Sequence, residues 1–192
     1  MSRDLPHAPG GLATGAGLHL HVDPATPRWL LPLARGLVLV NRGVMVLGMV
    51  ALLASALILS SSVVTRYFLH ASTDWQDEAS VFCLVGATFL CSAFVQAIRG
   101  HVGIEAVSSL LSARVNRVRV ACVDLGCLAF CVFFAWKSCT LLHEAWSEGQ
   151  TTSSSWAPPL WIPYLLMSLG MILLSVQLAV QCVVSVNKLG GR

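Results

Sequence analysis

The residues with the greatest capacity for specific chemistry lie together in a short polar stretch, residues 63–78, which reads VVTRYFLHASTDWQDE. Its charged members are Arg66, Asp74, Asp77 and Glu78, and its aromatic members are Tyr67, Phe68 and Trp75. Carboxylates in the first turn of a helix stabilise the positive end of the helix dipole, and they form ion pairs with a nearby arginine. Because an exposed ion pair contributes only about 0–1 kcal/mol, stability alone is a weak reason for the cluster. We therefore expect a function specific to one side of a membrane to reside here.

Cysteine and histidine, the other residues that bind metals and cofactors, are not grouped in a way that predicts such a site. The seven cysteines lie inside or at the end of apolar runs, where a thiol packs as a small apolar group, and no CxxC pair is present. The six histidines lie in tails, in loops or at the borders of apolar runs, whereas haem needs axial ligands inside a helical bundle. His19 and His21 alternate in the N-terminal segment without a third ligand. The sequence thus predicts no catalytic, cofactor-binding or metal-binding residue, and no enzyme.

The elements that carry these residues are predicted to be membrane helices. Of 192 residues, 56% are hydrophobic and 11% are charged, whereas a soluble domain carries about a quarter charged residues. Four apolar runs reach the length of about 20 residues that a helix needs to cross a hydrocarbon core of about 30 Å. We predict an all-α integral membrane fold with four transmembrane helices, at residues 43–65, 79–98, 120–142 and 163–186.

The segments outside these spans are predicted to be tails and surface helices. Residues 1–27, rich in Gly, Pro, Ala and His, are predicted to form a disordered tail, and they lack the features of a cleavable signal peptide. Residues 28–42 mix apolar side chains with arginines, which suits either an interfacial lead-in or a long first helix that emerges from the membrane. Residues 99–119 have apolar side chains at three- and four-residue spacing, which predicts an interfacial amphipathic helix between the second and third spans. Residues 187–192 form a second tail.

The distribution of Lys and Arg predicts the orientation of the spans. With four spans, both termini and the segment 99–119 share one side, and this side holds nearly all Lys and Arg side chains that lie outside the spans. The opposite side holds Arg66 alone. The positive-inside rule therefore places both termini in the cytoplasm and residues 63–78 outside. The net charge of +3 follows from this topology and gives no reason to expect nucleic-acid binding.

The third span carries two charges and one face of small side chains. Asp124 and Lys137 are thirteen residues apart, about 20 Å along a helix, which is too far for an ion pair. Each lies near its own end of the span, so we expect both to reach water at an interface. The small side chains recur every four residues, at Cys127, Cys131, Ala135 and Cys139. Such a face lets another helix approach closely, and the residues leave open whether that helix belongs to this chain or to a partner.

Three motifs in order resemble the small permease subunit of tripartite ATP-independent periplasmic (TRAP) transporters, the DctQ-like family. They are RYFLHASTDWQDE at the first corner, RGHVGIE after the second span and PPLWIPYLLMSLG at the start of the fourth, and the resemblance covers about residues 37–186. The matching residues are Arg66, Tyr67, Trp75, Asp77 and Glu78 in the first motif, His101 and Glu105 in the second, and Pro159, Pro163, Tyr164 and Gly170 in the third.

The resemblance implies a non-catalytic subunit in the inner membrane of a bacterium. In such a system a periplasmic binding protein captures an organic acid, and a large permease subunit moves it by a sodium-driven elevator motion. The small subunit then holds the large subunit in the bilayer. The candidate docking or interface residues are Arg66, Trp75, Asp77, Glu78 and His101, for which helix capping, ion pairing and interfacial hydrogen bonding are the plainer roles. The alternative is a stand-alone four-helix membrane oxidoreductase or small exporter.

Overall fold

The computed structural model describes residues 27–70, 72–98 and 113–190, and nearly all of these residues are helical. A short 3₁₀ helix, η1 (Arg28–Leu30), precedes four long helices: α1 (Leu31–Leu69), α2 (Asp74–Ala97), α4 (Ala113–Ser147) and α5 (Trp161–Gly190). All four are long and apolar enough to cross a membrane. The predicted all-α fold with four membrane-length helices is confirmed, while the cytoplasmic position of the termini stays a prediction.

Two predicted segments fall largely outside the described residues. These are the disordered tail at 1–27 and the interfacial helix at 99–119. Of the second, the residues from Ala113 onward belong to α4, which continues without a break into the predicted third span. An amphipathic helix lying on the membrane surface therefore stays a prediction for the remainder of that segment.

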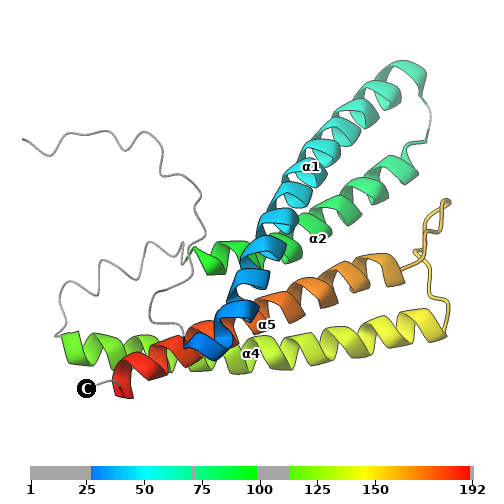
Figure 1. The fold of residues 1–192 in the computed structure, drawn as a ribbon. Helices are drawn as coiled ribbons and strands as arrows, with labels where there is room; N and C mark the ends of the chain where they lie inside the picture. Colours follow the sequence, from blue (N-terminus) through cyan, green and yellow to red (C-terminus); the bar gives the residue numbers. More distant parts are fainter. Residues whose placement is uncertain (1–26, 71, 99–112, 191–192) are drawn as a thin grey trace, which may run out of the picture.

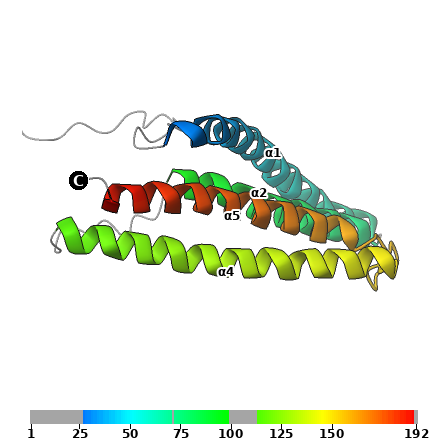
Figure 2. The same ribbon diagram turned by 60° about the horizontal axis from the view of Figure 1, so that its bottom comes forward.

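The four helices lie side by side in a row rather than around a common axis. The extensive contacts join α1 to α2, α2 to α5 and α5 to α4, so that α2 and α5 are the inner helices (Figures 1 and 2). The buried share of the most apolar segment is 33% for α2 and 28% for α5, against 11% for α1 and 17% for α4. Large apolar side chains on the two outer helices are consequently exposed, among them Leu57 and Phe130. The row thus presents broad apolar faces to whatever surrounds it.

Helix α1 is a single element, which agrees with the second alternative for residues 28–42, a long first helix, and not with a separate lead-in. Its 39 residues measure about 58 Å, close to twice the hydrocarbon thickness. The continuity follows from one narrow buried stripe, whose members lie three, four or seven residues apart, that runs through both predicted segments. The buried members of this stripe are Leu30, Ala34, Leu37, Asn41, Gly48, Ser55 and Ser62. Pro32 is tolerated because it occupies the first turn, where its missing N–H has no intrahelical acceptor.

Small residues set the distances between the helices. A Cβ atom added at Gly170 of α5 would lie 2.4 Å from the carbonyl oxygen of Phe89 in α2, so the two backbones touch at this point. A Cβ atom at Gly48 would lie 2.1 Å from the Sγ of Cys91, which brings α1 against α2. Between α4 and α5 the apolar core consists of Cys131, Ala135, Met171 and Leu178. The close approach of helices through small side chains is the usual packing mode in membranes.

Candidate functional site: an outer corner and a polar stripe on α5

The polar stretch predicted to carry function forms the corner between α1 and α2. Together with Ser62 we call it the outer corner (residues 62–78), after the side of the membrane on which it is predicted to lie. Helix α1 ends at Leu69, and His70 takes the left-handed conformation, with φ of 50°, that ends a helix and redirects the chain. Helix α2 begins at Asp74, after Thr73, whose carbonyl oxygen accepts hydrogen bonds from the amides of Gln76 (2.9 Å) and Asp77 (3.1 Å). The corner is therefore mostly helical, with only residues 70–73 between the two helices.

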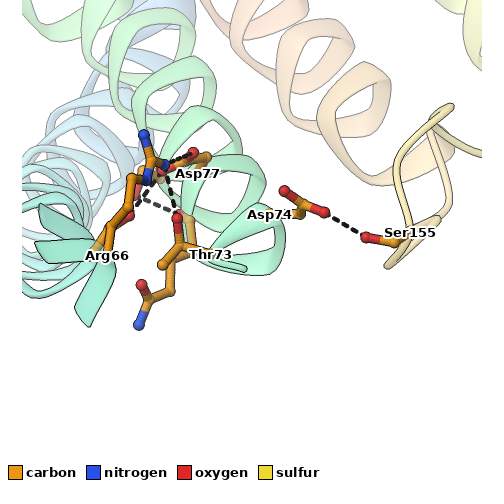
Figure 3. A network of polar contacts seen from close by, with 8 residues as sticks. Arg66, Thr73, Asp74, Asp77 and Ser155 are labelled. Atoms are coloured by element: carbon orange, nitrogen blue, oxygen red, sulfur yellow. Dashed lines mark hydrogen bonds and ion pairs between the residues drawn. The ribbon is translucent and has the colours of Figure 1, made fainter. Parts of the chain in front are cut away.

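Arg66 is the centre of a small hydrogen-bond network in the outer corner (Figure 3). Its Nη2 donates to the Oδ2 of Asp77 at 2.8 Å and to the Oγ1 of Thr73 at 2.7 Å. Ser62 completes the network by donating to the other carboxylate oxygen of Asp77 at 3.1 Å. The Arg66 and Asp77 side chains are 64% and 47% exposed, so the pair contributes about 1 kcal/mol at most. The network orients the guanidinium group more than it stabilises the fold.

The Thr73 side chain does not cap α2, although Thr73 stands at the N-cap position. Its hydroxyl oxygen accepts the Arg66 hydrogen bond instead of binding an amide of the first turn, and no side-chain cap bond is present. Asp74 is the first residue of the helix itself and accepts a hydrogen bond from the hydroxyl of Ser155 (Figure 3). The acidic groups of the first turn, Asp74 and Asp77, still lie at the positive end of the helix dipole.

The bond to Ser155 ties the outer corner to the loop between α4 and α5. This loop is folded on itself: the amide of Leu160 donates to the carbonyl of Gln150 at 2.9 Å, and the amide of Thr152 donates to that of Pro158 at 3.1 Å. The two hairpins of the row thus meet at this end through polar contacts. The loop carries serines and threonines with Glu148, and no Lys or Arg, so the surface beside the outer corner is acidic.

The remaining predicted interface residues are placed differently from one another. Trp75 is 51% exposed at the start of α2. Glu78 is partly buried and lines a hollow of about 360 Å³ between α2 and the start of α5, with Leu160 and Pro163 on the opposite side. Its Oε2 atom is buried and has no hydrogen-bond partner among the described residues. His101 lies outside the described residues.

Sequence reasoning missed a second polar group, which we call the α5 stripe: Gln177, Gln181 and Ser185. Each member binds a different helix. Gln177 accepts a hydrogen bond from Asn41 of α1 at 3.1 Å, Gln181 pairs with Gln96 of α2 at 2.8 and 2.9 Å, and Ser185 donates to Asp124 of α4 at 2.8 Å. The signal was present, since the three residues recur every four positions in an otherwise apolar run and therefore share one helix face. The stripe makes α5 the helix that joins the other three.

The expectation that Asp124 reaches water is wrong. Its side chain is 6% exposed and accepts the hydrogen bond from Ser185, because α5 covers the face of α4 on which it lies. A carboxylate at such depth requires hydrogen-bond partners, and α5 supplies one. Lys137, the other charge of the span, is exposed, and its Nζ lies 5.1 Å from the centre of the Trp136 ring.

The predicted small face of α4 divides between the core and the surface. Cys131 and Ala135 are buried against Met171 and Leu178 of α5, whereas Cys127 is exposed and Cys139 is partly buried. A four-residue step turns a helix by about 40° beyond a full turn, so four such positions drift away from one contact line. The buried side chains of α4 instead lie three, four or seven residues apart: Asp124, Cys131, Ala135, Ser138 and Ala145.

The fold and these polar groups define a multi-pass helical membrane protein. Within residues 27–70, 72–98 and 113–190, no three His, Cys, Asp or Glu side chains are grouped so as to hold a metal ion. Residues 55–187 match the family model of the DctQ component of tripartite ATP-independent periplasmic transporters, and the chain belongs to this family. A search of curated proteins and a search of solved structures returned no match.

Membership of the family gives the chain its general role. It is the small membrane subunit of a TRAP transporter. The DctQ family is a transporter component and not a family of enzymes. In TRAP systems DctQ proteins function with a large permease subunit and a substrate-binding protein. The alternative of a stand-alone oxidoreductase or exporter is therefore set aside.

Proposed function

We propose that this chain is the scaffold on which the large elevator-type permease subunit is held during sodium-driven import of an organic acid across a bacterial inner membrane. Both termini lie in the cytoplasm in this proposal, and the outer corner faces the periplasm. The observation that carries it is the row of helices, which leaves broad apolar faces on α1 and α4. Such faces suit a long contact with another membrane protein, because helix association in lipid depends on close packing over an extended surface.

The first part of the proposal is that the row of helices keeps a fixed geometry. The α5 stripe joins α5 to each of the other three helices, and Gly170 holds α2 against α5 without an intervening side chain. A support must keep its shape while its partner moves, and interhelical hydrogen bonds in lipid oppose sliding and rotation of the helices. The α5 stripe thus suits a static role.

The second part of the proposal is that the outer corner helps to dock the periplasmic binding protein. Arg66 balances the charge of Asp77, and the remaining carboxylates at this end, Asp74, Glu78 and Glu148, leave the surface acidic. Trp75 adds an exposed aromatic side chain, a residue type that often anchors protein interfaces. Rim charges of this kind accelerate the encounter with an oppositely charged partner.

The scaffold role is tested by purification and reconstitution. We expect the chain, extracted in mild detergent, to co-purify with a much larger membrane subunit and to show no visible cofactor absorbance. In proteoliposomes the two subunits together, with the binding protein outside, are expected to take up substrate along a sodium gradient, and the chain alone is expected to be inactive. Uptake or turnover by the chain alone would contradict the proposal.

The docking role is tested by replacing Asp77 and Glu78 together with alanine. We expect roughly threefold to tenfold slower uptake at limiting binding protein, because rim charges act on the rate of encounter, with unchanged recovery of the large subunit. Arg66→Ala is the matched comparison, since it breaks the same ion pair but keeps both carboxylates. It makes the corner more acidic, so the encounter rate should be equal to or higher than that of the wild type. Uptake kinetics unchanged by the double substitution would remove the docking role.

A further inference from the structure

A hollow of about 640 Å³ lies at the C-terminal end of α1. It is lined by Val63, Arg66, Tyr67 and His70. Arg66 and Tyr67 lie three and four residues after Val63, so these three share one face of the last turns of α1, and His70 directly follows the end of the helix. Three of the four side chains carry N–H or O–H groups, and the fourth is apolar. The hollow thus combines hydrogen-bond donors with a mostly apolar lining, and the scaffold role does not use it.

The length of α2 places this hollow at the boundary between lipid and water. Its 24 residues measure about 36 Å, only slightly more than the hydrocarbon core, so a membrane crossed by α2 has its boundary near Asp74. Arg66 is at the same depth because it is bonded to Thr73, the residue before α2. The exposed Val63 and Val64 lie three and two residues before Arg66, and therefore deeper, on the hydrocarbon side. Headgroup phosphates occupy this depth.

The guanidinium group of Arg66 is held ready for a further acceptor. Both of its hydrogen bonds within the described part of the chain use Nη2, and the side chain remains 64% exposed. The contacts with Asp77 and Thr73 restrict the long side chain, so a new bond from Nη1 or Nε would lose little conformational freedom. A phosphate group is the acceptor that the planar guanidinium fork fits best, with the Tyr67 hydroxyl and the His70 ring as further donors.

We propose that this hollow binds the headgroup phosphate of a membrane phospholipid, with an acyl chain lying along Val63. A phosphodiester carries one negative charge and has an apolar tail, which suits a recess at the negative, C-terminal end of a helix better than a free phosphate dianion does. Because Asp77 already balances the charge of Arg66, hydrogen bonding and not net charge selects the ligand. Zwitterionic and anionic phospholipids are therefore both accepted.

The test is native mass spectrometry of the protein extracted from its membrane in a maltoside detergent. We expect a retained phospholipid on the wild type and about a tenfold lower bound fraction in Arg66→Gln, the effect of losing one charge-assisted hydrogen bond. Asp77→Asn is the matched control, because it removes the charge of the ion pair but keeps an oxygen that can still accept the hydrogen bond from Arg66, so the guanidinium group stays in place and the lipid should be retained. Tyr67→Phe, which removes only an exposed hydroxyl group, is expected to lower the bound fraction by about threefold.

Three outcomes would overturn the proposal. The first is an unchanged bound fraction in both Arg66→Gln and Tyr67→Phe. The second is an equal loss in Asp77→Asn, which would assign the effect to the shape of the corner. The third is displacement of the lipid by millimolar inorganic phosphate, which would make the hollow a site for free phosphate. All three are read from the protein itself and do not depend on its transport activity.

Discussion

The outer corner and the α5 stripe are both built from hydrogen bonds between polar side chains, but they differ in exposure and in the sequence distance they connect. The Arg66 network joins residues 7 to 15 positions apart, and its ion pair is largely exposed. The α5 stripe joins residues 61, 85 and 136 positions apart, and Gln181, Asn41 and Asp124 are buried. One group shapes a turn of the chain, and the other holds separate helices together.

The difference in exposure gives the two groups different roles: the buried α5 stripe stabilises the fold, and the exposed outer corner is available for binding. Water competes for the groups of the outer corner, so their loss costs little and they are available to a partner. Within the row the same kinds of bond have no water to replace them, and in membrane proteins each contributes about 0.6–2 kcal/mol. The structure therefore concentrates its rigidity in α5 and leaves recognition to the corner.

The largest effect is expected where α5 touches α2 without any side chain between them. In Gly170→Val the new side chain would collide with the Phe89 carbonyl group, a backbone atom that cannot swing aside. We expect a loss of about 3 kcal/mol, at the upper end of the range for overpacking. The measurement is unfolding in mixed detergent micelles, monitored by tryptophan fluorescence. The ring centres of Trp146 and Trp161 are 5.1 Å apart, so this pair reports the packing of α4 on α5.

Gly126→Val is the matched control for this substitution. Gly126 lies on α4, and a Cβ atom added there meets nothing within 4 Å. We expect a change within about 0.5 kcal/mol, because valine has a slightly better helix propensity than glycine. Equal losses in the two variants would show that the contact of α2 with α5 is not what makes α5 rigid, and would weaken the comparison drawn above.

The same contrast explains how much could be predicted from the sequence. Hydropathy and length predicted four membrane helices because every residue of a span contributes to the signal. The cluster around Arg66 was predicted because its members are neighbours in the chain. The partner of Asp124 was missed because Ser185 is 61 residues away, and hydropathy gives the rotation of neither helix. For the same reason, the sequence did not predict that Cys131 and Ala135 would be buried while Cys127 is exposed.

A smaller effect is expected from the centre of the α5 stripe. Gln181→Leu removes both hydrogen bonds with Gln96. The side-chain amide and the backbone carbonyl of Gln96 then lose these partners. We expect a loss of about 1–2 kcal/mol in the same unfolding measurement. Thr140→Val is the control, since the Thr140 hydroxyl is exposed and bonds only within its own helix turn, and it should be nearly neutral. A Gln181→Leu variant as stable as the wild type would show that apolar packing alone orders the row.

The smallest effect is expected at the outer corner. Asp77→Asn removes the charge that pairs with Arg66 but keeps the size of the side chain and an oxygen that can still accept the Ser62 hydrogen bond. We expect a loss of about 0–1 kcal/mol, which shrinks further as salt is raised because both side chains are substantially exposed. A loss as large as that of Gln181→Leu, or one that does not respond to salt, would mean that the corner is shielded from water. Its charges would then belong to the structure of the row, and the proposed docking surface would have to be sought on the α4–α5 loop, where Glu148 lies.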